Sequence, residues 1–202
     1  MVVKKLLFIV LALTFQAADA PKTILFFGDS LTAGYGLSTE EAFPAQVEKK
    51  LLKDGKAAKV VNAGLSGETS AGGVSRIDWI LKQPVDIFIL ELGANDGLRG
   101  LPIEQTIKNL QTIIDKVKAK NPKVKIVIAG MMVPPNLGAD YSTRFQKIFP
   151  DLAKKNNATL IPFLLQDVAG NEKLNLSDGI HPNPEGHKIV AQNVLKAISP
   201  LI

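Results

Sequence analysis

Short, unbroken runs of apolar residues alternate along this chain with longer segments in which apolar residues recur at helical spacing. An unbroken run suits a parallel strand buried on both faces, whereas helical spacing suits a helix that buries one stripe. The runs predict strands at residues 23–27, 59–62, 85–92, 125–129 and 159–161. The spaced segments predict helices at residues 42–53, 71–82, 102–120, 184–198 and in the later part of 141–156.

The order of these elements indicates the fold class. Strands that alternate with helices form βαβ units, and such units build a parallel sheet that is covered on both faces. We therefore predict an α/β fold with a central parallel sheet of about five strands and helices on both faces. The pattern contains no repeat and no long linker, so residues 21–202 are expected to form a single domain.

Residues 1–20 have a different character. Two lysines precede the apolar stretch 6–13, and the small residues Ala18 and Ala20 follow it. This layout is typical of a secretory signal peptide, and the apolar stretch is shorter than the ~20 residues that span a bilayer. We expect cleavage near Ala20 and a periplasmic or secreted bacterial protein. An uncleaved anchor or a buried first helix is the alternative.

Composition and charge narrow the range of functions. Hydrophobic residues make up 46% of the chain and charged residues 21%, which is typical of a soluble globular protein. The lack of cysteine excludes disulfides, a thiol nucleophile and a cysteine-based zinc site, and the presence of only 2 histidines excludes a histidine-rich metal site. The net charge of +5 is scattered without interleaved aromatic residues, so no nucleic-acid partner is expected.

Small and polar residues follow the first three predicted strands. Ser30 follows the first strand, Gly67 the second and Asn95 the third, while Asp178 and His181 precede the last helix. Ligands of such folds bind beyond the carboxyl ends of the strands, so these residues are expected to meet there. A serine hydroxyl, a histidine base and an aspartate that orients the base form the nucleophilic half of an acyl-transfer site.

The same residues supply the electrostatic half of such a site. The tetrahedral intermediate of acyl transfer carries an oxyanion, which requires hydrogen-bond donors. The available donors are the N–H groups of Ser30 and Gly67 and the Nδ2 of Asn95. Each residue also has a structural interpretation. Ser30 suits the N-cap of a short helix, Gly67 a turn residue, and Asn95-Asp96-Gly97 a turn.

Other sites fit the sequence less well. Ser66 is a rival nucleophile, but its surroundings lack the G-x-S-x-G pattern. His187 lies near the start of the last helix and fits capping or solvation of that helix better than catalysis. No glycine-rich phosphate-binding motif occurs. A zinc site built from His181, His187 and Asp178 has no familiar ligand spacing, so no metal is expected.

Four segments together resemble the signature blocks of the GDSL or SGNH hydrolase family. They are Gly28-Asp29-Ser30-Leu31, residues 64–69 around Gly67, Gly93-Ala94-Asn95-Asp96, and Asp178-Gly179-Ile180-His181-Pro182. The resemblance covers residues 21–202 and is strongest to small bacterial periplasmic esterases, thioesterases and lysophospholipases. It implies a flavodoxin-like three-layer fold, an acyl pocket bordered by residues 96–101, and catalysis without a metal or an organic cofactor.

The residues and the resemblance lead to one functional hypothesis. The chain is expected to be a serine esterase that hydrolyses small-molecule carboxylic esters or thioesters through an acyl-enzyme intermediate. The expected catalytic residues are Ser30, His181 and Asp178. The expected oxyanion hole comprises Ser30, Gly67 and Asn95, and the expected substrate contacts are Asp96, Leu98 and Pro134.

Two alternatives stay open at the level of the sequence. An O-acetylesterase of carbohydrate or peptidoglycan requires a polar groove, whereas Met131, Met132 and Val133 favour an apolar pocket. A non-catalytic binding module on the same fold belongs to another class, and the presence of all four signature residues argues against it. No stable membrane insertion of the mature chain is expected, and the sequence does not indicate an oligomeric state.

Overall fold

A parallel sheet of five strands forms the centre of the protein. The computed structural model describes residues 21–202, so the expected signal peptide lies outside the described residues. The strands run in the order β2-β1-β3-β4-β5, and all neighbouring pairs are parallel. Their bounds are β1 (Lys22–Gly28), β2 (Ala58–Gly64), β3 (Ile87–Glu91), β4 (Lys125–Ala129) and β5 (Thr159–Ile161). All five strands were predicted from their unbroken apolar runs.

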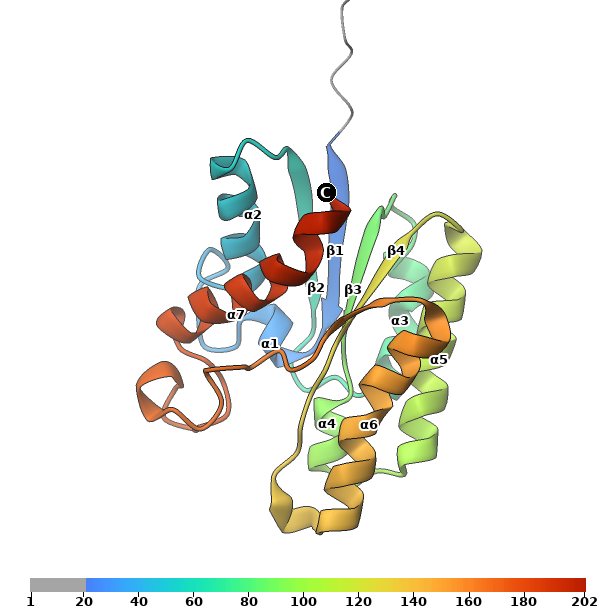
Figure 1. The fold of residues 1–202 in the computed structure, drawn as a ribbon, viewed down its shortest axis with the longest axis vertical. Helices are drawn as coiled ribbons and strands as arrows, with labels where there is room; N and C mark the ends of the chain where they lie inside the picture. Colours follow the sequence, from blue (N-terminus) through green and yellow to red (C-terminus); the bar gives the residue numbers. More distant parts are fainter. Residues whose placement is uncertain (1–20) are drawn as a thin grey trace, which may run out of the picture.

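Helices cover both faces of the sheet. On one face lie α2 (Phe43–Lys53) and α7 (Pro184–Ile198), which pack against each other (Figure 1). On the other face lie α3 (Ser70–Ile80), α5 (Ile103–Lys120) and α6 (Ala139–Asn156). The three layers confirm the predicted α/β fold and its flavodoxin-like architecture.

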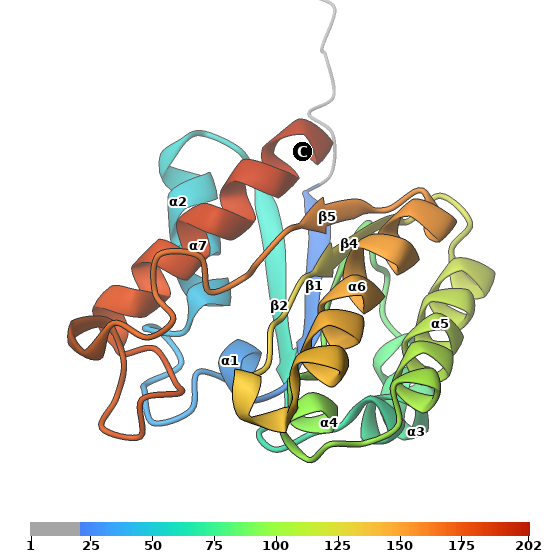
Figure 2. The ribbon, with the colours of Figure 1, turned by 60° about the horizontal axis from the view of Figure 1, so that its bottom comes forward.

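Short helices occupy the connections. Figure 2 shows α1 (Ser30–Ala33) and α4 (Ala94–Leu98) side by side below the carboxyl ends of the strands. A short helix near Ser30 was considered as a structural interpretation of that residue, whereas α4 was not predicted because Asn95-Asp96-Gly97 was interpreted as a turn. Three single turns of 3-10 helix complete the described elements, at Pro135–Leu137, Glu172–Leu174 and Ser199–Leu201.

The core lies between the sheet and its two helical layers. Residues 24–27 of β1 and 87–89 of β3 are fully buried, because these strands lie in the middle of the sheet. Within α3, Ile77 and Ile80 are buried, whereas Trp79 is 68% exposed.

The two ends of the described chain meet at the amino-terminal edge of the sheet. The Lys22 ammonium donates a hydrogen bond of 2.8 Å to the carbonyl of Leu201.

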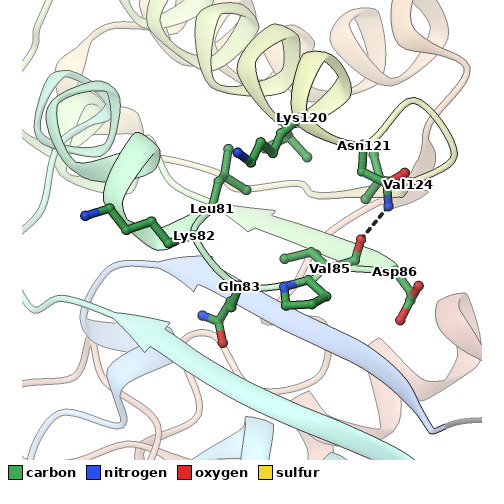
Figure 3. A pocket seen from close by; sticks show the side chains of 10 residues that line it. Leu81, Lys82, Gln83, Val85, Asp86, Lys120, Asn121 and Val124 are labelled. Carbon is green, nitrogen blue, oxygen red and sulfur yellow. Dashed lines mark hydrogen bonds between the residues drawn. The ribbon is translucent and has the colours of Figure 1, made fainter.

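A hollow of about 360 Å³ also lies at this end of the sheet, between the ends of α3 and α5 (Figure 3). The Asn121 side chain donates to the Val85 carbonyl beside it at 2.9 Å. None of the expected site residues lines this hollow.

No helix within residues 21–202 has the length and apolar character needed to cross a bilayer.

Candidate active site

The turn from β1 into α1 presents Ser30 at the carboxyl edge of the sheet. Asp29 is the N-cap of α1, and its Oδ1 accepts a hydrogen bond of 3.0 Å from the N–H of Leu31. Gly28 precedes it, and a Cβ at that position would collide with Thr32 and Glu91. The expected N-cap role therefore belongs to Asp29, which leaves Ser30 as the first residue of the helix. Its N–H lies in the first turn, where no intrahelical partner exists.

Ser30, His181 and Asp178 form a continuous hydrogen-bonded chain. The Ser30 Oγ lies 2.8 Å from His181 Nε2, and His181 Nδ1 lies 2.7 Å from Asp178 Oδ2. The segment that carries the histidine is fixed by the Leu176 N–H, which donates to the His181 carbonyl at 2.7 Å. This arrangement has the geometry of a nucleophile, a base and a group that orients the base.

Asp178 is held as a carboxylate by its surroundings. The backbone N–H of His181, the ring of His181 and the N–H of Ile180 all hydrogen-bond to it and lower its pKa to about 2. A carboxylate acceptor fixes the tautomer of the imidazole, with the proton on Nδ1 and a free acceptor on Nε2. His181 Nε2 can then accept the proton of the Ser30 hydroxyl.

The other two expected oxyanion donors, Gly67 and Asn95, follow β2 and β3, the strands on either side of β1. Gly67 occupies the turn between β2 and α3 with a φ of +79°, a left-handed conformation that favours glycine. Asn95 is in the first turn of α4, and its Nδ2 lies 3.1 Å from Asp29 Oδ2 and 3.1 Å from the Glu68 carbonyl. The Asn95 carboxamide is therefore held between Asp29, in the turn that precedes Ser30, and Glu68, in the turn that contains Gly67.

Two buried carboxyl groups lie beneath Ser30. Glu91 ends β3, and its Oε2 accepts from Thr32 Oγ1 at 2.7 Å and from the Asp29 N–H at 3.2 Å. Burial, followed by the neighbouring Asp29, raises the pKa of Glu91 well above its usual value. Burial also raises the pKa of Asp29 to about 6, against the opposing effects of the Leu31 N–H and of His181. A protonated Glu91 keeps two anions from facing each other next to Ser30.

The expected substrate contacts have different surroundings. Leu98 and Pro134 are exposed, as a substrate contact requires. Asp96 is only 2% exposed, and its carboxylate accepts hydrogen bonds from the Ser70 N–H, the Ser70 hydroxyl and Thr106. The expectation that the Asp96 side chain contacts substrate is therefore wrong. Its carboxylate instead ties α4 to α3 and α5.

The rival residues do not join the Ser30 group. His181 hydrogen-bonds to Ser30 and not to Ser66, which is exposed on its loop. His187 is only 1% exposed, so its interpretation as a capping or solvated residue of its own helix is wrong. Its Nδ1 instead accepts from the Phe43 N–H at the start of α2, at 3.0 Å. Within residues 21–202, no three His, Cys, Asp or Glu side chains are grouped so that they could hold a metal ion.

Sequence reasoning did not identify two further residues of this group. Tyr35 lies over His181, with 4.6 Å between the ring centroids, and is half exposed. Asp29 orients Asn95 as well as capping α1. Asp29 was visible within the Gly28–Leu31 block, whereas nothing in the sequence pairs Tyr35 with a histidine so far along the chain.

Comparisons with known proteins identify the family of this chain. A family model described as the GDSL-like lipase/acylhydrolase family matches residues 26–189. The chain is 41% identical over 197 residues to a protein of Escherichia coli strain K12 named thioesterase 1/protease 1/lysophospholipase L1, and the match covers 97% of this chain and 91% of that protein. It is 37% identical over 191 residues to esterase TesA of Pseudomonas aeruginosa, covering 94% and 93%.

A solved structure shows the same likeness in three dimensions. The psychrotrophic esterase EstA of a Pseudoalteromonas species, inhibited by monoethylphosphonate, superimposes with a TM-score of 0.84 and 34% sequence identity. The match covers 89% of this chain and 98% of EstA.

Proposed function

This chain belongs to the GDSL-like lipase/acylhydrolase family, and from that premise we propose that Ser30 is the nucleophile with which it hydrolyses carboxylic esters and thioesters. The protein is a serine ester hydrolase of this family. The observation that carries the assignment of the nucleophile is the distance of 2.8 Å between Ser30 Oγ and His181 Nε2, together with the bond from His181 to Asp178.

The reaction proceeds in two acyl transfers. Ser30 Oγ attacks the carbonyl carbon while its proton passes to His181 Nε2, and the carbonyl oxygen becomes an oxyanion. The bond to the leaving group then breaks, and the alcohol or thiol takes the proton from His181. Water, deprotonated by the same Nε2, attacks the acyl-enzyme. The bond between the carbonyl carbon and Ser30 Oγ then breaks, Oγ takes the proton back from Nε2, and the acid departs. Asp178 stabilises the imidazolium in both halves.

Three donors stabilise the oxyanion in each half. They are the N–H groups of Ser30 and Gly67 and the Nδ2 of Asn95, which the β1, β2 and β3 connections bring to one edge. In the free protein, Asn95 Nδ2 also reaches the Glu68 carbonyl. The oxyanion is a stronger acceptor than the neutral Glu68 carbonyl, so it can share the hydrogen that Asn95 Nδ2 donates to that carbonyl.

The rim of the site favours apolar acyl or aryl groups. Exposed apolar side chains project from the connections that follow the strands and from the His181 segment. They are Tyr35 (51% exposed), Leu65 (53%), Leu98 (44%), Met132 (43%) and Ile180 (53%). Such a rim suits a hydrocarbon chain or an aromatic ring better than an acetylated glycan. The names of the relatives, which include arylesterase and lysophospholipase, agree with this preference.

The N-terminal segment supports a proposed location. The two lysines, the apolar stretch 6–13 and the small residues up to Ala20 support export to the periplasm or the exterior. N-terminal sequencing of the exported protein would test cleavage near Ala20.

A panel of p-nitrophenyl esters of rising chain length tests the proposed reaction. We expect kcat/KM to rise from acetyl toward medium acyl chains and to exceed the rate on acetylated xylan or peptidoglycan. Ser30→Ala should reduce kcat by at least ~10³-fold and still fold, because it removes only one half-buried hydroxyl. Ser66→Ala is the matched control and should retain wild-type activity. The opposite result for these two variants would refute the assignment.

A further inference from the structure

A partly buried ion pair between Glu68 and Arg76 lies next to the Gly67 turn. Glu68 follows Gly67, and its side chain is only 3% exposed. Arg76, on α3, donates through Nε to Glu68 Oε1 at 2.6 Å and through Nη2 to Glu68 Oε2. Burial of the Glu68 carboxylate costs free energy, which the close, bidentate contact with the half-buried Arg76 offsets.

Arg76 also contacts both strands that lead into the site. Its Nη2 donates to the carbonyl of Ala63 at 2.8 Å and lies 3.4 Å from the carbonyl of Gly28. The guanidinium carbon lies 4.1 Å from the centre of the Phe27 ring, within the range of a cation–π interaction. One side chain therefore contacts the end of β1, just before Ser30, and the end of β2, just before the Gly67 turn.

The backbone of the Gly67 turn also contacts Asn95, the side-chain donor of the proposed oxyanion hole. The Glu68 carbonyl accepts from Asn95 Nδ2 at 3.1 Å, and the Gly67 carbonyl accepts from the Arg99 side chain at 3.1 Å. The side chain of Glu68 thus points to Arg76 while its carbonyl points to Asn95. Movement of Glu68 would displace the N–H of Gly67 and the carboxamide of Asn95 together.

We propose that Glu68 and Arg76 are positioning residues of the oxyanion hole, in which their ion pair fixes the Gly67 N–H and Asn95 Nδ2 relative to Ser30. This inference rests on the proposed function. Neither side chain contacts the reacting atoms. Because the oxyanion exists only after attack, a misplaced hole raises the barrier of the chemical step and leaves the binding of the substrate almost unchanged.

Kinetics of Glu68→Gln and Arg76→Lys test the proposal. Glutamine preserves the shape of Glu68 without its charge, and lysine preserves the charge of Arg76 without the bidentate fork. Rates are measured on a p-nitrophenyl ester and divided by the concentration of sites that react with a phosphonate inhibitor. We expect kcat to fall by ~10-fold to ~10²-fold, less than the loss of a whole donor, and KM to change by less than ~3-fold.

Asp78→Asn is the matched control. Asp78 lies on the same helix and forms an exposed ion pair with Lys116. Its loss should leave kcat unchanged. If Glu68 and Arg76 only stabilise the fold, their variants will melt at a lower temperature and keep the wild-type kcat per reactive site, which would overturn the inference.

A double variant tests whether the effect passes through the oxyanion hole. In the Asn95→Ala background, Glu68→Gln should reduce kcat by a smaller factor than in the wild type, because one of the two donors it positions is already missing. Full additivity would overturn the inference.

The proposed function is tested separately. An active Ser30→Ala refutes that function, whereas an inactive Ser30→Ala with unchanged kcat in Glu68→Gln refutes the positioning role alone.

Discussion

His187 should make the stability of this protein depend on pH in a way that one substitution removes. Its ring is buried, lies 6.0 Å from the parallel ring of Phe43, and accepts the Phe43 N–H through Nδ1. Burial, and then the charge of His181, lowers the pKa of His187 from 6.5 to about 4, while Glu41 opposes the shift. Protonation of Nδ1 would also destroy the acceptor on which the start of α2 depends.

The sign and size of the effect follow from this pKa. The folded protein keeps His187 neutral until the pH approaches 4, whereas the unfolded chain protonates it near 6.5. The stabilisation is thus complete above 6.5 and is lost as the pH falls toward 4. The shift corresponds to roughly 3 kcal/mol in full, and about 2 kcal/mol is already lost by about pH 5.

The pH dependence of the wild type alone cannot isolate this contribution. The folded-state pKa values of Asp29 and Glu91 are raised, so both groups act in the opposite direction and stabilise the fold as the pH falls. His187→Gln provides the reference, since glutamine does not titrate and its oxygen can accept the Phe43 N–H. The informative quantity is the difference in unfolding free energy between wild type and variant.

Urea denaturation at about pH 7.5 and about pH 5 measures that difference. Wild type should be the more stable protein at the higher pH, and its advantage over His187→Gln should shrink by about 2 kcal/mol at the lower pH. A difference that changes by less than ~0.5 kcal/mol would refute the reasoning. The pH profile of kcat/KM should be the same in both proteins, because His187 contacts α2 and not Ser30.

Three further substitutions test the site. Asn95→Ala should lower kcat by ~10²-fold to ~10³-fold with a smaller effect on KM, and a change confined to KM would make Asn95 a substrate-binding residue instead. Asp178→Asn should melt near the wild-type temperature, yet lose up to ~10⁴-fold in kcat/KM, because asparagine no longer stabilises the imidazolium of His181. A lowered melting temperature with normal kinetics would leave Asp178 with a role in loop shape only. In urea denaturation, Glu91→Gln should gain stability relative to wild type as the pH rises from about 5 to about 8. The raised pKa of Glu91 means that its protonated form stabilises the wild-type fold, and this stabilisation is lost as the pH rises. An equal difference at both pH values would contradict the raised pKa.

Local pattern was sufficient to predict the sheet and the main helices. Strands such as 24–27 are apolar at every position because both faces are covered, and that signal needs no tertiary information. The short α4 was not predicted, since Asn95-Asp96-Gly97 has weak helix propensity. It is stabilised by contacts from distant elements, such as those of Asp96 with Ser70 and Thr106.

In the candidate site, too, some residues could be predicted from the sequence and others could not. The grouping of Ser30, His181 and Asp178 was predictable because their chemistry and order are visible in the sequence. The roles of His187 and Asp96 were not, because each depends on a partner brought close only by folding: the Phe43 N–H for His187, and Ser70 for Asp96. A buried polar side chain and an exposed one look alike in a sequence, and only the fold distinguishes them.

The hydrogen bond between Lys22 and the Leu201 carbonyl has a consequence for protein engineering. The ends of residues 21–202 lie beside each other at the end of the sheet opposite to α1, so a short flexible linker can join them without distorting a strand. A circular permutant opened at the exposed Gly55, between α2 and β2, would keep every strand in its present neighbourhood. By the same geometry, a domain fused to either end, or a solid support that holds it, would leave the proposed site around Ser30 facing solvent and open to substrate.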